Sequence, residues 1–270
     1  MRREESPFLL SRASGGEDQV VVATGDFDTA ITEIAPHGRW TRELRAASVD
    51  VLRKCLADAP AAIVVDLRDL GDPDGASAPL WMTARTWGDQ QLPTVPVVVC
   101  LPTAAPLAGV LRRRGARWFL PVYATAPEAR AALLSRHALT ERITAHLEPD
   151  AAALPVVPEI VRQACTSWDL PGVREPAERV LTELVDNAIE HAGTRIDVAL
   201  TRRSHGLHLA VHDRHPGLPW LPGRAPGDPG DPGRHGLGLR LVHATATAWG
   251  AVPTRKGKMV WAAIAAPHHP

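Results

Sequence analysis

Three side chains able to do chemistry recur at four-residue spacing in the stretch 181–192. Glu183, Asn187 and His191 would lie on one side of a helix, because residues four apart are neighbours along a helix. Carboxylate and amide oxygens suit a divalent cation better than they suit apolar packing. For this stretch alone a solvated, charged helix face is the commoner interpretation. The residues that follow it favour a site instead.

Further features with ligand chemistry come after this stretch, in a fixed order. Asp213 ends an apolar strand, where its carboxylate can accept a hydrogen bond from an exocyclic amine such as that of adenine. Gly217 allows close backbone approach to a flat ligand. Gly236 and Gly238 precede a helix N-terminus, whose free N–H groups and dipole favour phosphate. Each feature alone is common, but all of them in this order after an Asn-bearing helix predict a nucleotide site.

Helices and short strands are expected to position these residues. The helix that bears Glu183 is expected over 175–192, and its broad apolar face should lie against a sheet. Residues 220–234 are rich in Pro, Gly and Asp, and have the length and composition of a mobile lid. The other elements expected in this half are helices over 157–168 and from 235 onward, and strands over 194–201, 207–212, 251–252 and 259–265.

Strands alternate with helices in the first half of the chain. This order predicts an α/β or α+β layer, with helices packed on a mostly parallel sheet. We expect residues 1–17 to be disordered, 18–140 to form one domain, 141–154 to be a linker and 155–267 to form a second domain. The expected strands are 20–23, 31–34, 61–67, 95–101 and 118–122, and the expected helices are 40–56, 77–87, 104–114 and 126–139.

Composition excludes several classes of partner. The chain has 30 Lys+Arg and 30 Asp+Glu, so no global field favours nucleic acid or an anionic membrane. No apolar run approaches the roughly 20 residues needed to span a bilayer. Cys55, Cys100 and Cys165 lack the spacing of metal ligands or of a disulfide framework. We therefore expect a cytoplasmic protein with no direct nucleic-acid or membrane contact.

The second half resembles the GHKL ATPases, and most of all the anti-sigma-factor serine/threonine kinases, over residues 150–267. Residues 183–191 are similar to the family's N box, 213–217 to its G1 box and 236–239 to its G2 box. Residues 249–250 and 257–261 are similar to its closing segment. In the G1 box, His215 replaces the first glycine of the usual Asp-x-Gly-x-Gly pattern and Pro216 stiffens the turn.

This resemblance implies a Bergerat (GHKL) α/β sandwich that binds ATP and Mg²⁺. It implies that Asn187 holds Mg²⁺, that Glu183 is the base for the attacking hydroxyl, and that Asp213 reads adenine. Minor roles would fall to His191 and Arg234. The remaining ATP-binding positions implied by the match are Gly217, Gly236, Leu237, Gly238 and Leu239.

The first half resembles the STAS domain, the fold of anti-sigma-factor antagonists, over residues 18–140. The likeness rests on residues 38–40, 65–67 and 115–122. The family's regulatory loop reads Asp-Ser-Ser-Gly, and its second serine receives phosphate. Here the loop begins at Asp74 and places Ala76 at the acceptor position. Ser77 is either a shifted acceptor or, in the interpretation we favour, a helix N-cap.

Two functions are consistent with these resemblances. The first is an ATP-dependent serine/threonine protein kinase in partner-switching regulation of transcription. It would phosphorylate a STAS-domain antagonist in trans, with that antagonist and/or a sigma factor as partner. The alternative is a non-catalytic, nucleotide-dependent regulator that binds protein, with the STAS-like domain as a docking module in the same chain. Both leave open whether the chain forms a homodimer.

Overall fold

The computed structural model describes residues 7–11, 14–16, 19–113, 119–136, 141–204, 206–219 and 237–266. Its sheets mix parallel and antiparallel strands and are accompanied by helices, which confirms the predicted α/β class. The chain divides into two compact units. The N-terminal unit is Leu10–Thr140 with Val252–Arg255, and the C-terminal unit is Met1–Leu9, Glu141–Ala251 and Lys256–Pro270. Among the described residues, no helix combines the length and apolar character needed to cross a membrane.

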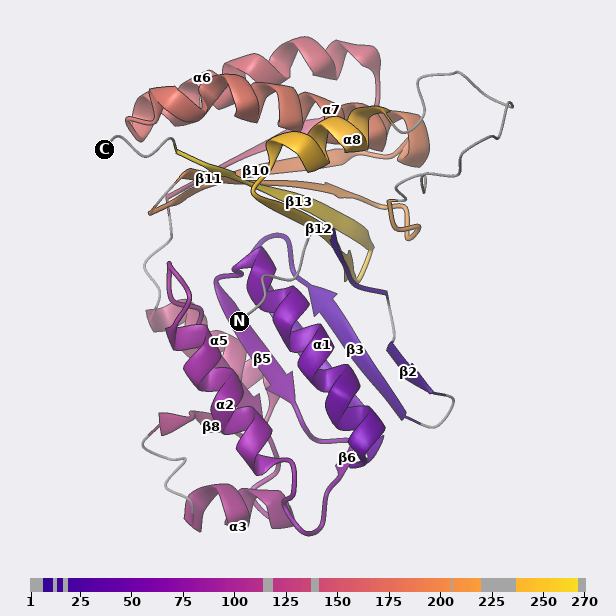
Figure 1. Cartoon of the computed structure of the whole chain (residues 1–270), viewed down its shortest axis with the longest axis vertical. Coiled ribbons are helices and arrows are strands. Elements are labelled where there is room, and N and C mark those ends of the chain that lie inside the picture. Colours follow the sequence, from indigo (N-terminus) through magenta and orange to yellow (C-terminus); the bar gives the residue numbers. More distant parts are fainter. Residues whose placement is uncertain are drawn as a thin grey trace. The chain divides into compact units, whose positions relative to one another are not determined.

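The C-terminal unit contains an antiparallel sheet with helices on one face (Figure 1). Its strands follow the order β12 (Ala248–Thr254), β13 (Gly257–Ala265), β11 (Gly206–Asp213), β10 (Ile196–Arg203) and β9 (Arg142–Leu147). β1 (Phe8–Leu9) lies parallel to β12. The helices are α6 (Val157–Ser167), α7 (Arg174–Ala192) and α8 (Leu237–Thr245), with short 3-10 turns at Ala151–Val156 and Pro171–Val173.

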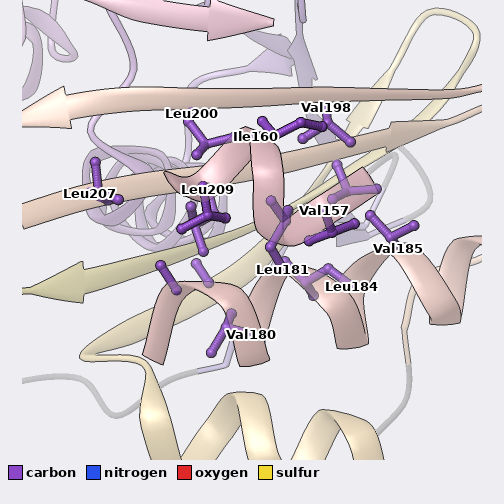
Figure 2. Close-up of a cluster of buried hydrophobic side chains, with 14 of the residues drawn as sticks. Val157, Ile160, Val180, Leu181, Leu184, Val185, Val198, Leu200, Leu207 and Leu209 are labelled. Carbon is purple, nitrogen blue, oxygen red and sulfur yellow. The ribbon is translucent and has the colours of Figure 1, made fainter. Parts of the chain in front are cut away.

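The apolar face of α7 packs on this sheet, as the sequence predicts. Figure 2 shows Leu181, Leu184 and Val185 of α7 in one cluster with Val198 and Leu200 of β10. All five side chains are buried, and burial of each such side chain is worth about 1.5–3 kcal/mol. This packing fixes the rotation of α7 about its axis, so Glu183 and Asn187 lie half-buried beside the core rather than within it.

Two expectations about the ends of the domains are wrong. Residues 142–147 belong to no linker, because β9 pairs antiparallel with β10 at the edge of the sheet. The alternating side chains of Ile143, Ala145 and Leu147 pack against the core of the C-terminal unit, which is why this segment forms a strand. The segment expected to be disordered contains β1 and also β2 (Ser14–Gly16), which pairs with β3.

The N-terminal unit contains a mixed sheet, in which β3 pairs antiparallel with both β2 and β4. Its strands follow the order β8 (Val122–Tyr123), β7 (Val97–Cys100), β5 (Ala62–Asp66), β4 (Ile31–Arg39) and β3 (Gln19–Gly25). β3 and β4 are antiparallel, whereas β4, β5, β7 and β8 are parallel in succession. The two-residue strand β6 (Leu70–Gly71) pairs with β4.

Helices alternate with these strands, as predicted. All five residues of β5 are buried, as expected for a parallel strand covered on both faces. α5 packs on one face through Ala126, Ala129 and Leu133. The strand predicted over 118–122 begins only at Val122. The helices found among the described residues of this unit are α1 (Arg42–Asp58), α2 (Ala78–Asp89), α3 (Pro106–Arg113) and α5 (Ala126–Arg136).

Candidate nucleotide site

The functional face of α7 carries the three side chains that the sequence singles out. Glu183 and Asn187 are half-buried and lie one turn apart, while His191 lies exposed in the last turn. The helix ends at Ala192 because Gly193 adopts a left-handed conformation, with φ of +56°. The Gly193 N–H then donates to the carbonyl of Ala188, which satisfies one of the final helix carbonyls.

Glu183 lies directly against the first turn of α8. A Cβ atom placed on Gly238 would lie 2.3 Å from Glu183 Oε2 and 3.3 Å from its Cδ atom. Any larger residue at position 238 would therefore displace the carboxylate. The structure thus brings together one residue from each of two motifs that are far apart in the sequence, on neighbouring helices.

The surroundings of Glu183 suit a proton acceptor. Burial raises the pKa of the Glu183 carboxyl, and the nearby carboxylates of Asp186 and Glu190 raise it further. A carboxylate with a raised pKa is a stronger base than one free in water, which is what general base catalysis near neutral pH requires.

Asp213 forms a buried ion pair inside the sheet. Its Oδ1 accepts hydrogen bonds from the His215 N–H at 2.8 Å and from Lys258 Nζ at 2.9 Å. Lys258 Nζ also lies 2.9 Å from Asp213 Oδ2, and both side chains are at most 3% exposed. The predicted adenine-reading carboxylate is therefore held by a cation of the chain itself.

Sequence reasoning missed Lys258, although it lies directly opposite Asp213 in the β11–β13 register. The available signal was a single lysine in an otherwise apolar closing strand. Its partner depends on how β13 pairs with β11, and pairing register cannot be read from either strand alone.

The turn after Asp213 folds back on itself. The Gly217 N–H donates to His215 Nδ1 at 3.1 Å, and a Cβ atom on Gly217 would lie 2.8 Å from His215 Cε1. The close approach that glycine permits here is therefore made to an imidazole of the same turn. His215 itself is exposed.

The remaining predicted residues of the nucleotide site lie at or before the start of α8. Leu237 begins the helix, and Leu239 is 6% exposed and belongs to the core of the C-terminal unit. Gly236, Arg234 and the predicted lid over 220–234 fall outside the residues that the structure describes.

In the N-terminal unit, the loop before α2 holds Ser77 in a buried network. The Ser77 hydroxyl donates to Asp72 Oδ2 at 2.6 Å and accepts from Trp81 Nε1 at 2.9 Å. Ser77 occupies the N-cap position, as we favour, but its hydroxyl accepts no hydrogen bond from a backbone N–H of the helix. Asp72 accepts from the N–H groups of Ala76 and Ser77 instead. Asp74 and Ala76 are exposed.

Comparisons with known proteins find similar solved structures and one matching family. One of the solved structures is an anti-sigma factor antagonist from Mycobacterium paratuberculosis, at 15% sequence identity and a TM-score of 0.36. The match covers 48% of this chain and 99% of that one. No curated protein matches the chain. Over residues 172–267 the chain matches the family described as histidine kinase-, DNA gyrase B-, and HSP90-like ATPase, and so carries an ATPase domain of the GHKL type there.

Proposed function

We propose that the chain is a protein kinase of the anti-sigma-factor type, which transfers the γ-phosphoryl group of ATP to a serine or threonine of a partner protein. The observation that carries this proposal is the meeting of Glu183 on α7 with Gly238 in the first turn of α8. This contact supports the proposal, because a carboxylate with a raised pKa lies beside a helix N-terminus, where backbone N–H groups favour phosphate. The family match over residues 172–267 supports the use of ATP.

The chemistry of α7 fits Mg²⁺. Mg²⁺ prefers oxygen ligands, and at nucleotide sites it takes one or two protein side chains together with substrate phosphates and water. The described residues contain no group of three or more metal-ligating side chains, so we assign the ion to Asn187 together with phosphate oxygens and water. When bound, Mg²⁺ neutralises charge on the phosphoryl oxygens.

In the proposed transfer, Glu183 of α7 acts on the hydroxyl of the partner and α8 acts on the triphosphate. The hydroxyl oxygen of the partner attacks the γ-phosphorus, its proton passes to Glu183, and the bond to the ADP oxygen breaks. In this proposal the first turn of α8 holds the triphosphate through backbone N–H groups. Gly238 leaves room for the Glu183 carboxylate beside that turn. Glu183 therefore binds the hydroxyl and accepts its proton, while α7 and α8 hold the two reactants in place.

The acceptor that we propose belongs to another protein. Ala76, at the position that matches the usual acceptor, has no hydroxyl. Ser77 is completely buried, and its hydroxyl is committed to Asp72 and Trp81. The partner that fits is a STAS-domain antagonist with a serine in the corresponding loop, and the setting is partner-switching control of a sigma factor.

The second candidate is a regulator that binds nucleotide without transferring phosphate. Ala76 favours it, because the N-terminal unit has no hydroxyl at the position that matches the usual acceptor and could act as a docking module without being phosphorylated. In that case nucleotide binding would only adjust the affinity of the chain for its protein partner.

A transfer assay separates the two candidates. The wild-type chain is incubated with γ-labelled ATP, Mg²⁺ and purified single-domain STAS proteins from the same host. We expect label on a STAS serine or threonine, and a loss of about a hundredfold or more in rate for Glu183→Gln. Glu175→Gln, an exposed position in the first turn of the same helix, should behave as wild type. ATP binding without label transfer to any STAS protein would leave the second candidate.

A further inference from the structure

Lys258 forms an ion pair with Asp213, the carboxylate that the sequence assigns to adenine. Resting on the nucleotide site proposed above, we propose that Lys258 competes with the adenine amine for Asp213. The chain then gains little from the adenine base and holds a nucleotide mainly by its triphosphate. Lys258 is thus a selectivity-determining residue that acts through Asp213.

The ion pair is built into the strand register. Asp213 and Lys258 are direct partners across β11 and β13. A Cβ atom on Gly257 would lie 2.0 Å from the carbonyl oxygen of Asp213, so the backbones approach closely just before the pair. This close approach fixes where β13 begins and keeps Lys258 opposite Asp213.

Hydrogen bonds as well as charge join Lys258 to Asp213 and its turn. Lys258 Nζ donates to Asp213 Oδ1 at 2.9 Å and to the His215 carbonyl at 3.3 Å, and it lies 2.9 Å from Asp213 Oδ2. Asp213 Oδ1 also accepts from the His215 N–H. An incoming amine would therefore have to share a carboxylate whose two oxygens already lie in contact with an ammonium group.

Charge favours the lysine over adenine. An ammonium and a carboxylate attract each other as two full charges, whereas a neutral exocyclic amine offers the carboxylate only a dipole, so the amine is the weaker partner for Asp213. An adenine amine that reaches the carboxylate must also lie beside the positive charge of Lys258. To read adenine, the site has to open the ion pair, and this lowers the affinity gained from the base.

A comparison of two ligands on the wild-type chain tests the proposal without any substitution. Calorimetric titration uses ATP and inorganic tripolyphosphate, each with Mg²⁺, because the second ligand has the phosphates and no base. We expect the two dissociation constants to agree within about threefold. An ATP affinity more than about thirtyfold above that of tripolyphosphate would overturn the proposal, because it would show that the base is read while Lys258 is present.

Substitutions then test whether Lys258 limits the affinity for the adenine base. Lys258→Met should tighten ATP binding by about tenfold or more and leave tripolyphosphate unchanged. Lys256→Met, in the exposed turn of the same hairpin, should match wild type for both ligands. The double variant Asp213→Asn/Lys258→Met should lose the gain, because the carboxylate that reads the amine is gone. Circular dichroism shows which variants are folded.

Failures of this proposal and of the proposed function can be distinguished. If folded Lys258→Met gains nothing for ATP, or gains equally for both ligands, the ion pair only joins two strands and the competition is refuted, whatever the transfer assay shows. If neither ligand binds to the wild-type chain or to any folded variant, both proposals fall together.

Discussion

Gly238→Ala separates the catalytic role of α8 from its structural role. The new Cβ atom would lie 2.3 Å from Glu183 Oε2 in the present geometry, so the carboxylate has to move. The atom in the way is the far end of a flexible, half-buried side chain, and moving it off its rotamer costs about 0.5–1.5 kcal/mol. Replacing glycine by alanine within a helix returns about 0.5–1 kcal/mol.

These opposing effects leave the free energy of unfolding within about 1 kcal/mol of wild type, which corresponds to a shift in Tm of only about 2–4 °C. Phosphoryl transfer should nevertheless fall by about a hundredfold, because the displaced base no longer reaches the hydroxyl. Differential scanning fluorimetry measures Tm, and label transfer from γ-labelled ATP measures the rate.

A matched control for Gly238→Ala lies in α3. A Cβ atom on Gly109 would meet only the ends of arginine side chains, with Arg113 Nη1 the nearest at 3.3 Å, so Gly109→Ala tests the helix effect without touching Glu183. It should leave transfer at the wild-type rate. Transfer by Gly238→Ala at the wild-type rate would refute the role given to the Glu183–Gly238 contact. A fall in Tm far beyond about 4 °C would instead assign position 238 to packing.

Three further changes have defined outcomes. The pKa of Glu183 is raised in the folded state, so between the ordinary and the raised pKa the folded state binds more protons than the unfolded state. Glu183 therefore lowers stability as pH rises through this interval. Glu183→Gln should raise Tm at pH 7 but not below pH 4, and an equal change in Tm at both pH values would contradict the burial argument. Ser77→Ala should lower stability by about 1–3 kcal/mol in urea unfolding, because Trp81 Nε1 loses its acceptor, while phosphopeptide mapping of the folded wild-type chain should find no phosphate on Ser77. Lys258→Met should destabilise by about 3–5 kcal/mol, because it leaves the Asp213 carboxylate buried without its positive partner, and a loss under 1 kcal/mol would show that the carboxylate is satisfied in some other way.

The sequence predicts α7 closely because its signals are local. The apolar periodicity predicts the helix over 175–192, and the structure has it over Arg174–Ala192. The one-sided apolar face of α7 also indicates correctly that it packs on a sheet. Apolar periodicity acts within a few residues of chain, so one sequence is enough to read it.

Other parts of the structure depend on pairings that the sequence does not contain. We expect residues 142–147 to be linker because the segment 140–155 is polar and then rich in Ala and Pro, with an expected boundary at 148–150. Antiparallel pairing with β10 makes them the edge strand β9. In the same way, the ion pair of Lys258 with Asp213 depends on the register between β11 and β13.

Ser77 illustrates a third limit, that of naming a hydrogen-bond partner. The start of a helix next to Ser77 was predicted correctly, since α2 begins at Ala78. The sequence does not say which side chain satisfies the free N–H groups there. Asp72 does so, and it leaves the Ser77 hydroxyl to bond with Asp72 and Trp81.

The most direct test of a Mg-nucleotide site on α7 is a calorimetric titration of ATP into wild type and Asn187→Ala, with and without Mg²⁺. We predict that Mg²⁺ tightens ATP binding to wild type, that Asn187→Ala loses about tenfold or more of the Mg²⁺-dependent affinity, and that binding without Mg²⁺ is unchanged. Asp186→Asn, at the neighbouring position of the same helix, serves as the control and should retain the effect of Mg²⁺. The same Mg²⁺-dependent affinity in Asn187→Ala and wild type would contradict the assignment of this helix as the metal and catalytic wall of the site.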